Sequence, residues 1–285
     1  MLEYEQINRI PPYLVNYKVA EFLLEDIPLG DLTTEATVDK NEIATAELRA
    51  QENMIFVGEF LFYYFFDEKF QVDSLIKDGE GAKNGDVIAR ITGPAYLILM
   101  RERVLLNIIQ RLSGIATMAH KFALLAKPFG VKILDTRKTS PGLRMFERFA
   151  VKMGGGSNHR LDLSSGILIK DNHIKAAGGI KNAIEKCRNK FPEITPEIEV
   201  ENLEQIEEAL EANAEAFLLD NMTPELMKQA VYLIRAKPNG KNIFIEASGG
   251  MTFDNIQDYL ATGINAVSIG ALTHSFKSAE IHLEF

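Results

Sequence analysis

The chain of 285 residues has a single cysteine, no long apolar run and fewer basic than acidic residues. With Cys187 as the one thiol, neither an intrachain disulfide nor a thiolate metal cluster can form, which fits a reducing compartment. The longest aromatic and apolar run, residues 60–66, falls far short of the ~20 residues that a helix needs to cross a bilayer. Residues 1–12 contain Glu3 and Glu5 and lack the apolar stretch of a signal peptide. We therefore expect a cytoplasmic protein that contacts no membrane.

The excess of acidic residues limits the partners that the protein can have. Asp and Glu number 40 against 31 Lys and Arg, so the formal net charge is −9, and the pI is near 5.2. Most of such a surface repels phosphate backbones, so we expect no nucleic acid as a partner. Any anion site must be a local concentration of positive charge.

The pattern of apolar residues changes near residue 130, although no low-complexity linker divides the chain. A composition of 46% hydrophobic and 25% charged residues is typical of a globular protein. The first part predicts a mixed α and β domain, with a helix that ends before Pro28 and a long helix over 95–126 that Gly114 could interrupt. Its expected strands are 44–50, 54–57, 70–76 and 87–91.

From residue 131 onward, short apolar strands alternate with amphipathic helices. The expected strands are 132–134, 167–169, 198–200, 216–219, 243–245 and 266–269, and the helices between them include 203–212, 224–235 and 252–261. This alternation is typical of βαβ units and a parallel sheet, either a barrel or a doubly wound sheet.

Polar side chains and glycines follow or end each of these strands. They are Asp135 to Lys138, Lys170 to His173, Glu199 and Glu201, Asp220 and Asn221, Glu246 to Gly250, and Gly270 with Ala271. In a β/α barrel the carboxyl ends of the strands form the face that carries the active site. We therefore expect these residues to line one pocket.

The residues of this set are sorted by charge along the chain. The early cations are Arg137, Lys138, Arg144, His159, Arg160 and Lys170. Because the arginine fork donates two parallel hydrogen bonds, this half suits a small molecule rich in carboxylates. The loops at Ser248-Gly249-Gly250 and Gly270 suit a sugar phosphate, although an ordinary tight turn would also use such glycines. Glu199 and Asp220 lie between the halves and could bind ribose hydroxyls or Mg²⁺.

A series of motifs along the chain resembles the quinolinate phosphoribosyltransferase family. They are DTRKTSPGLR at 135–144, GGGSNHR at 154–160, LIKDNH at 168–173, LDN at 219–221, EASGG at 246–250 and GALTHS at 270–275. Earlier matches are ED at 25–26, GDLTT at 30–34, ER at 102–103, LN at 106–107 and SGIAT at 113–117. The resemblance covers nearly the whole chain in order, which makes it more specific than any lone motif.

The resemblance implies an enzyme of NAD biosynthesis. It would transfer phosphoribosyl from phosphoribosyl pyrophosphate to quinolinate with Mg²⁺, and release nicotinate mononucleotide, pyrophosphate and CO₂. The implied fold is an α/β sandwich domain over residues 1–113, to which a tail at 275–285 returns, and an open, incomplete β/α barrel of the TIM-barrel type over 114–274. The implied assembly is a homodimer in which Arg103 reaches the partner's site.

The resemblance also implies roles for individual residues. Quinolinate would be held by Arg103, Thr136, Arg137, Lys138, His159, Arg160 and Lys170. The phosphoribosyl group would be held by Glu199, Asp220, Ser248, Gly249, Gly250 and Gly270. Lys138, Lys170, Glu199 and Asp220 would be catalytic, and the two acids would also hold Mg²⁺, directly or through water.

Three positions depart from the family pattern, and three other functions stay open. The family more often has Gly where this chain has Asp162, Asp where it has Ser165 and Lys where it has Arg148, which bears on the choice of base. The alternatives are a relative with the same fold that uses another base, an aldolase-like barrel with Lys170 as Schiff-base nucleophile, and a binding protein without catalysis.

Overall fold

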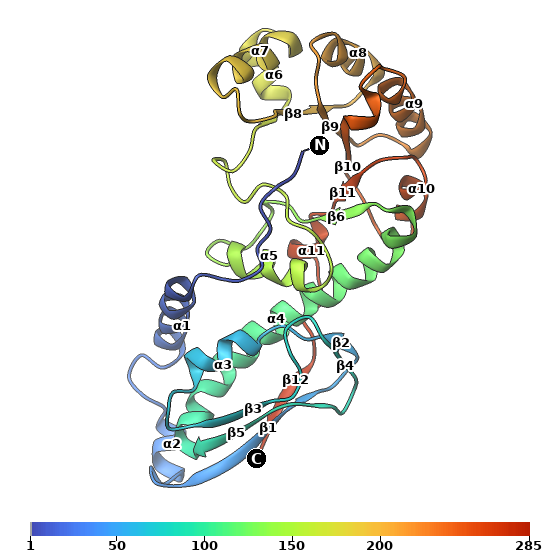
Figure 1. The fold of residues 1–285 in the computed structure, drawn as a ribbon. Coiled ribbons are helices and arrows are strands. Elements are labelled where there is room, and N and C mark those ends of the chain that lie inside the picture. The colour runs from blue at the N-terminus through green and yellow to red at the C-terminus, as the bar shows by residue number, and fades with distance from the viewer. Residues whose placement is uncertain (1) are drawn as a thin grey trace. The chain divides into compact units, whose positions relative to one another are not determined.

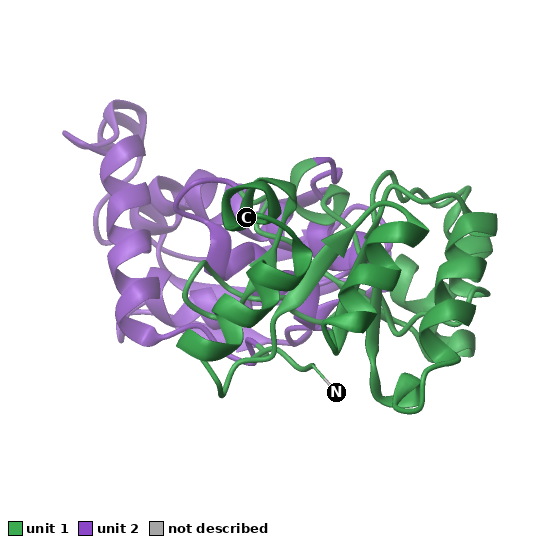
Figure 2. Ribbon diagram, turned by 90° about the horizontal axis from the view of Figure 1, so that it is seen from above, with its two compact units in different colours: residues 1–6, 121–139, 156–274 green, residues 7–120, 140–155, 275–285 purple. Residues whose placement is uncertain are grey.

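The computed structural model describes residues 2–285 and divides the chain into two compact units. Unit 1 contains residues up to Gln6 together with Lys121–Thr139 and Gly156–His274. Unit 2 contains Ile7–His120, Ser140–Gly155 and Ser275–Phe285. Figure 2 shows the two units in different colours, and each unit combines three separate segments of the sequence.

Unit 2 is built on a small antiparallel sheet. Its strand order is β12-β1-β5-β3, and a separate pair joins β2 to β4. The strands are β1 (Ile43–Ala50), β2 (Met54–Ile55), β3 (Gln71–Ser74), β4 (Gly81–Ala82), β5 (Val87–Pro94) and β12 (Ile281–Glu284). The helices are α1 (Pro12–Asp26), α2 (Leu32–Thr37), α3 (Glu59–Phe65), α5 (Arg144–Met153) and most of α4 (Ala95–Ala126).

Two helices of unit 2 differ from what their sequence suggests. The aromatic run at 60–66 forms α3, in which Leu61, Phe62 and Phe65 are buried and Tyr63 is 82% exposed. Helix α4 continues without a break through Gly114. The glycine is needed there for space, because a Cβ atom would lie 2.2 Å from the backbone oxygen of Lys277.

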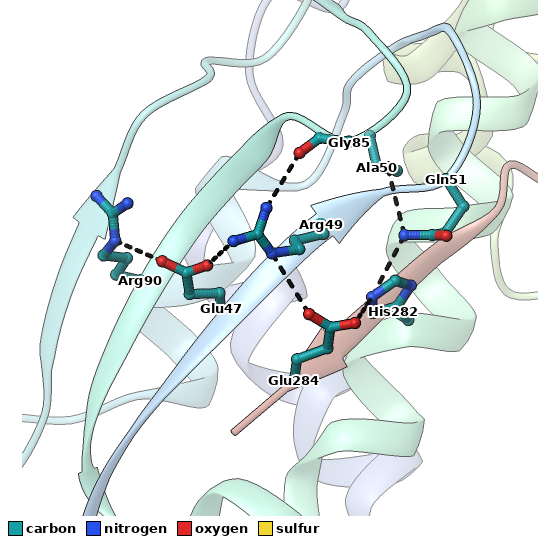
Figure 3. A network of polar contacts seen from close by, with 8 residues as sticks. All are labelled: Glu47, Arg49, Ala50, Gln51, Gly85, Arg90, His282 and Glu284. Atoms are coloured by element: carbon teal, nitrogen blue, oxygen red, sulfur yellow. Dashed lines mark hydrogen bonds and ion pairs between the residues drawn. The ribbon is translucent and has the colours of Figure 1, made fainter.

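The C-terminal strand is held in the sheet of unit 2 by pairing and by a polar network. Strand β12 pairs antiparallel with β1 from Glu47 opposite Glu284 to Ala50 opposite Ile281. Figure 3 shows how Arg49 on β1 contacts both Glu47 and Glu284, with Arg49 Nε 3.4 Å from Glu284 Oε2. Because water still reaches these charges, the ladder and the buried face contribute more stability than the ion pairs.

Unit 1 is built on a six-stranded parallel sheet in the order β6-β11-β10-β9-β8-β7. The strands are β6 (Lys132–Leu134), β7 (Leu168–Ile169), β8 (Glu197–Val200), β9 (Ala216–Asp220), β10 (Phe244–Ser248) and β11 (Ala266–Ser268). The first strand pairs with the last, which is the order of a ring that is open between β6 and β7. The sheet has six strands, not the eight that close a TIM barrel.

The helices of unit 1 lie on the outer side of this curved sheet (Figure 1). They are α6 (Asp171–Ala177), α7 (Ile180–Lys190), α8 (Leu203–Glu211), α9 (Pro224–Arg235), α10 (Ile256–Leu260) and α11 (Ala271–His274), with short 3₁₀ turns at Lys127–Phe129 and Gly240–Asn242. Helix α8 begins where the Asn202 side chain accepts from the amide of Gln205, and α9 begins where Thr223 accepts from Leu226. The buried residues of α9, among them Met227 and Val231, recur at helical spacing, as its sequence predicts.

The compact units do not divide at the residue 113/114 boundary that the sequence suggested. Helix α4 runs straight through that boundary, residues 140–155 belong with unit 2, and residues up to Gln6 belong with unit 1. A sequence pattern locates elements but not the packing partners of a terminal segment. None of the described helices combines the length and apolarity needed to cross a membrane.

Candidate active site

The pocket of unit 1 is formed by every second residue of its strands. Side chains alternate between the two faces of a strand, so Glu197 and Glu199 on β8 point to the same side. The same alternation applies to Leu218 and Asp220 on β9 and to the inward residues of β10. Two levels of side chains therefore lie inside the curved sheet, one deeply buried and one at the carboxyl ends of the strands.

The carboxyl-end level encloses a cavity of about 410 Å³, which is in the range of small-molecule sites. Its walls are Thr136, Arg137, Lys138, His159, Arg160, Leu168, Lys170, Glu199, Leu218, Asp220, Asn221, Glu246, Ser248, Gly249, Gly250 and Ser268. This set contains every residue of the parallel-sheet part to which the resemblance assigns a role, except Gly270. Gly270 adjoins it, because a Cβ there would lie 2.9 Å from Lys138 Cδ. Of the other residues that were expected to line one pocket, Asp135, residues 171–173 and Glu201 are among those that do not. Arg103 and Arg144 belong to unit 2.

One end of this cavity gathers guanidinium groups. The buried Nε of Arg137 has no hydrogen-bond partner among the described residues. Burial, and then the positive charge of Arg137, lower the pKa of Arg160. A lowered pKa of Arg160 and an unused donor on the neighbouring Arg137 are the arrangement that a carboxylate ligand would stabilise.

Buried Asp135 positions the segment that carries this end. Asp135 Oδ1 accepts from the backbone amide of His159 at 2.9 Å, and Oδ2 accepts from Asn158 Nδ2 at 2.5 Å. The Arg160 guanidinium donates through Nη1 to the oxygen of Gly166 at 3.0 Å. The backbone before and after Arg160 is therefore fixed, which limits where its side chain can reach.

The middle of the cavity contains an ion pair between Lys170 and Glu199. Lys170 stands at the N-terminal cap of α6, where its own amide donates to His173 Nδ1 at 2.9 Å. Asp220 Oδ2 accepts from the side-chain amide of Asn221 at 2.6 Å. These carboxylates are oxygen donors of the kind that Mg²⁺ prefers.

The other end of the cavity is formed by glycines. Gly249 has φ +100°, and a Cβ there would lie 2.2 Å from Asn221 Oδ1. Gly250 has φ +60° and open space beside it. Helix α10 begins only at Ile256, later than the predicted residue 252, so the glycines lead into a loop and not directly into a helix. The loop amides, more than a helix dipole, are what this end offers to an anion.

Beneath the cavity lies a buried cluster of His159, Glu197, Glu246 and Tyr4. His159 Nε2 is 3.3 Å from Glu197 Oε2 and 3.5 Å from Glu246 Oε2. Both glutamates are fully buried. Among the described residues, Glu197 Oε1 and both oxygens of Glu246 lack a hydrogen-bond partner. Two negative charges in this position would be costly to bury.

The titration of this cluster follows from its burial. Burial, followed by the charge of Glu197, raises the pKa of Glu246 to about 8. Burial lowers the pKa of His159, but Glu246 and Glu197 raise it by more, so the net shift is upward. Glu246 therefore binds a proton near neutral pH, which reduces the buried negative charge.

His159 could hold a substrate carboxylate only after its ring nitrogens change partners. Nδ1 accepts from the backbone amide of Arg160 at 2.7 Å, while Nε2 faces the two glutamates. Its ring lines the cavity, but both nitrogens are engaged within the protein. The three ligand atoms of His159, Glu197 and Glu246 lie within 4.8 Å of one another, a group that could also hold a metal ion. Glu199 and Asp220 are not members of that group.

Sequence reasoning missed Tyr4 and Glu197 as parts of the site. The alternation along β8 would have placed Glu197 on the same face as Glu199. For Tyr4 the one signal was the alternation of Leu2, Tyr4 and Gln6 with the acidic Glu3 and Glu5.

Two of the positions that depart from the family pattern contact each other. Asp162 Oδ1 accepts from the hydroxyl of Ser165 at 2.6 Å and from the amide and hydroxyl of Ser164 at 2.8 and 2.7 Å. The Ser165 and Ser164 hydroxyls lower the pKa of Asp162. The carboxylate is thus held by its own loop, and Asp162 is not among the residues that line the cavity. Arg148, the third position, is fully buried in α5 of unit 2.

Comparison with known families matches both parts of the chain. The model described as "Quinolinate phosphoribosyl transferase, C-terminal domain" matches residues 115–284, and that of the N-terminal domain matches residues 31–113. The chain belongs to the quinolinate phosphoribosyltransferase family. The family has the α/β fold found here, a small sheet domain joined to a parallel-strand sheet.

Individual relatives of this family match over nearly their whole length. A probable nicotinate-nucleotide pyrophosphorylase (carboxylating) of Bacillus subtilis is 43% identical over 92% of this chain and 90% of its own. The nicotinate-nucleotide pyrophosphorylase (carboxylating) of Mycobacterium leprae is 35% identical over 92% and 94%. The solved structure of the Francisella tularensis nicotinate-nucleotide pyrophosphorylase is 35% identical, has a TM-score of 0.93 and covers 99% of both chains.

Proposed function

We propose that the protein transfers phosphoribosyl from phosphoribosyl pyrophosphate to quinolinate and releases CO₂, giving nicotinate mononucleotide and pyrophosphate for NAD biosynthesis. The observation that carries this proposal is the two-ended cavity, with Arg137 and Arg160 at one end and Gly249 and Gly250 at the other. A dicarboxylate suits the first end and a sugar phosphate suits the second. The names of the relatives agree with this chemistry.

In the proposed reaction the residues of the cavity chiefly position the substrates and stabilise the charge that develops on them. The pyridine nitrogen of quinolinate attacks C1 of the ribose as pyrophosphate leaves, and positive charge develops on the sugar. Glu199 and Asp220 lie between the two ends of the cavity and stabilise that charge electrostatically. The carboxylate next to the ring nitrogen then leaves as CO₂, the new pyridinium charge stabilises the electron pair that stays on that ring carbon, and a proton adds to the same carbon.

The lysines and the acids of the cavity have complementary tasks in this proposal. Lys138, beside Gly270, supports the anionic substrates, and Lys170 exchanges its partner Glu199 for a quinolinate carboxylate. Glu199 and Asp220 would hold Mg²⁺, directly or through water, and Mg²⁺ would offset the negative charge of the pyrophosphate. The oxygen-only donor set supports this choice of metal.

We further propose a homodimer in which Arg103 completes the site of the partner. Arg103 is exposed on α4 in unit 2. Unit 2 also exposes large apolar side chains, which monomers rarely leave in solvent. They include Tyr13 at 76%, Leu24 at 66%, Leu29 at 98%, Leu32 at 85% and Tyr63 at 82%. The mass of the particle in solution tests the dimer, and cell fractionation tests the expected cytoplasmic location.

The decisive experiment follows nicotinate mononucleotide and CO₂ together, with quinolinate, phosphoribosyl pyrophosphate and Mg²⁺ present and nicotinate as a parallel substrate. Equal amounts of both products from quinolinate are expected. Product from nicotinate alone would agree with a phosphoribosyl site at the glycine end of the cavity and would contradict quinolinate as the substrate.

A mixing experiment tests the role of Arg103. R103A and K138A should each be nearly inactive. A mixture of the two variants, after subunit exchange, should regain up to about a quarter of wild-type activity, because half of the dimers then contain one intact site. No recovery, with exchange verified by tagged subunits, would place Arg103 and Lys138 in the same subunit's site.

A further inference from the structure

Residues 2–6, here called the N-terminal strap, enter the inside of the curved sheet of unit 1. Figure 1 shows this blue segment ending on the concave side of the strands. Its side chains alternate, with Leu2, Tyr4 and Gln6 partly buried and Glu3 and Glu5 exposed. Leu2 packs against the core cluster of Leu134, Ala216, Phe244 and Ala266. The strap is thus anchored below the level of the cavity.

Tyr4 of the strap contacts three separate pieces of the base-binding end. Its ring stacks on His159 with centroids 4.4 Å apart and an interplanar angle of 22°. Its hydroxyl donates to Glu197 Oε2 at 2.7 Å. A Cβ at Gly166 would lie 2.9 Å from Tyr4 Cε1, so the ring fits against that glycine. These contacts join β8, the 157–160 segment and the loop before β7.

Gln6, on the same face of the strap as Tyr4, also bonds to this segment. Its amide donates to the backbone oxygen of Asn158 at 3.0 Å and accepts from the Asn158 amide at 2.9 Å. Ser157 meanwhile pairs with β6 through the bridge to Leu134. The segment before His159 is therefore bonded to the sheet on one side and to the strap on the other.

Two residues that contact the Tyr4 ring, His159 and Gly166, also accept hydrogen bonds from Arg160. His159, under the Tyr4 ring, precedes Arg160 and receives its amide hydrogen at Nδ1. Gly166, also against the Tyr4 ring, accepts the hydrogen bond of the Arg160 guanidinium. Loss of the ring would release both the backbone and the guanidinium partner of Arg160. A guanidinium whose position is not fixed binds a carboxylate less well, because the two parallel hydrogen bonds require a defined orientation.

We propose that Tyr4 is a positioning residue for the dicarboxylate end of the cavity, acting through His159 and Arg160. The proposal deepens the proposed function and rests on it for the identity of the ligand. The contacts of Tyr4 with Glu197, His159 and Gly166 all lie at the dicarboxylate end, so its effect should fall on quinolinate and not on phosphoribosyl pyrophosphate.

The test compares steady-state constants for Y4A, Y4F and E5A. We expect Y4A to raise the KM for quinolinate at least about tenfold and to leave the KM for phosphoribosyl pyrophosphate within about twofold. Y4F retains the stacked ring and should lose only about threefold, since one hydrogen bond is missing. E5A removes an exposed neighbour of the same strap and should match the wild type. Equal increases in both KM values for Y4A, or no increase in either, would overturn the proposal.

A second readout does not depend on turnover. In wild-type protein labelled at histidine and kept above the raised pKa of His159, nitrogen NMR should show Nδ1 of His159 without hydrogen and Nε2 with hydrogen. In Y4A this signal should broaden or shift, while Y4F should retain it. An unchanged His159 signal in Y4A would contradict the strap's role even if the protein proved to use another base. Failure of quinolinate turnover in the wild type would contradict the proposed function alone.

Discussion

Two glutamates on one strand, Glu197 and Glu199, have opposite surroundings although they point the same way. Glu199 lies at the cavity level, is 15% exposed and pairs with Lys170. Glu197 lies one level deeper, is fully buried and has a tyrosine, a histidine and a second glutamate as neighbours. Burial depth, more than residue type, separates a carboxylate that faces the cavity from one whose neighbours are buried or half-buried protein groups.

The largest expected effect comes from changing Glu199, a glutamate that lines the cavity. In the proposed reaction, E199Q removes the charge that stabilises the ribose, and it also removes the partner of Lys170, so kcat should fall about 10²- to 10³-fold. The thermal midpoint should change little, since the cavity is open to solvent. Steady-state kinetics and calorimetry measure the two quantities. Activity within tenfold of wild type would mean that Glu199 has no charge-stabilising role.

The second effect is the pH dependence of stability that buried Glu246 should cause. The folded pKa of Glu246, about 8, exceeds its ordinary 4.5. Between these values the folded state binds more protons than the unfolded state, so the free energy of unfolding falls as pH rises from about 5 to 8. The loss should be on the order of a few kcal/mol. Chemical denaturation at several pH values measures it.

The matched variant E246Q should lose most of that slope, because glutamine is neutral at every pH in the range. A wild-type slope that persists in E246Q would assign the titration to another group. A protein whose stability increased over this range would contradict a protonated Glu246.

The third effect contrasts the glycines of the phosphate end. G249A places a methyl group against Asn221 and forces a left-handed backbone onto alanine, so the KM for phosphoribosyl pyrophosphate should rise about tenfold or more. In G250A the alanine also has a left-handed backbone, but its methyl group meets no neighbouring atom, so the KM for phosphoribosyl pyrophosphate should rise less. An equal effect on the KM for quinolinate would argue against a separate phosphate end.

The smallest effect concerns Asp162, which is half-buried and held by Ser164 and Ser165. D162N should change the KM for quinolinate by less than about threefold, because the carboxylate is bonded within its own loop. A larger fall in KM would show that the charge of Asp162 does repel the substrate.

The sequence predicted the strands of unit 1 well and their side-chain neighbours only in part. Short apolar runs bounded by helices placed β6, β9 and α9 to within a residue. The aromatic run at 60–66 gave no clear period, so α3 was not foreseen. Polar residues at strand ends predicted nearly all of the cavity, since parallel strands bring their carboxyl ends together.

What the sequence could not predict depends on distant contacts. The hydrogen bond from Tyr4 to Glu197 joins residues 193 positions apart. No local pattern encodes such a pairing. The protonation of Glu246 likewise depends on its own burial in the folded protein and on the charge of Glu197 from another strand.

The pairing of β12 with β1 has a consequence for how the protein is made. The last strand of the chain completes a sheet whose first strand is β1, so residues more than 230 positions apart must meet. While the ribosome is still synthesising the polypeptide, one edge of β1 has no neighbour, and unpaired edges invite association between nascent chains. Contacts of such long range also slow folding. The sheet of unit 2 therefore stays incomplete until β12 has been synthesised.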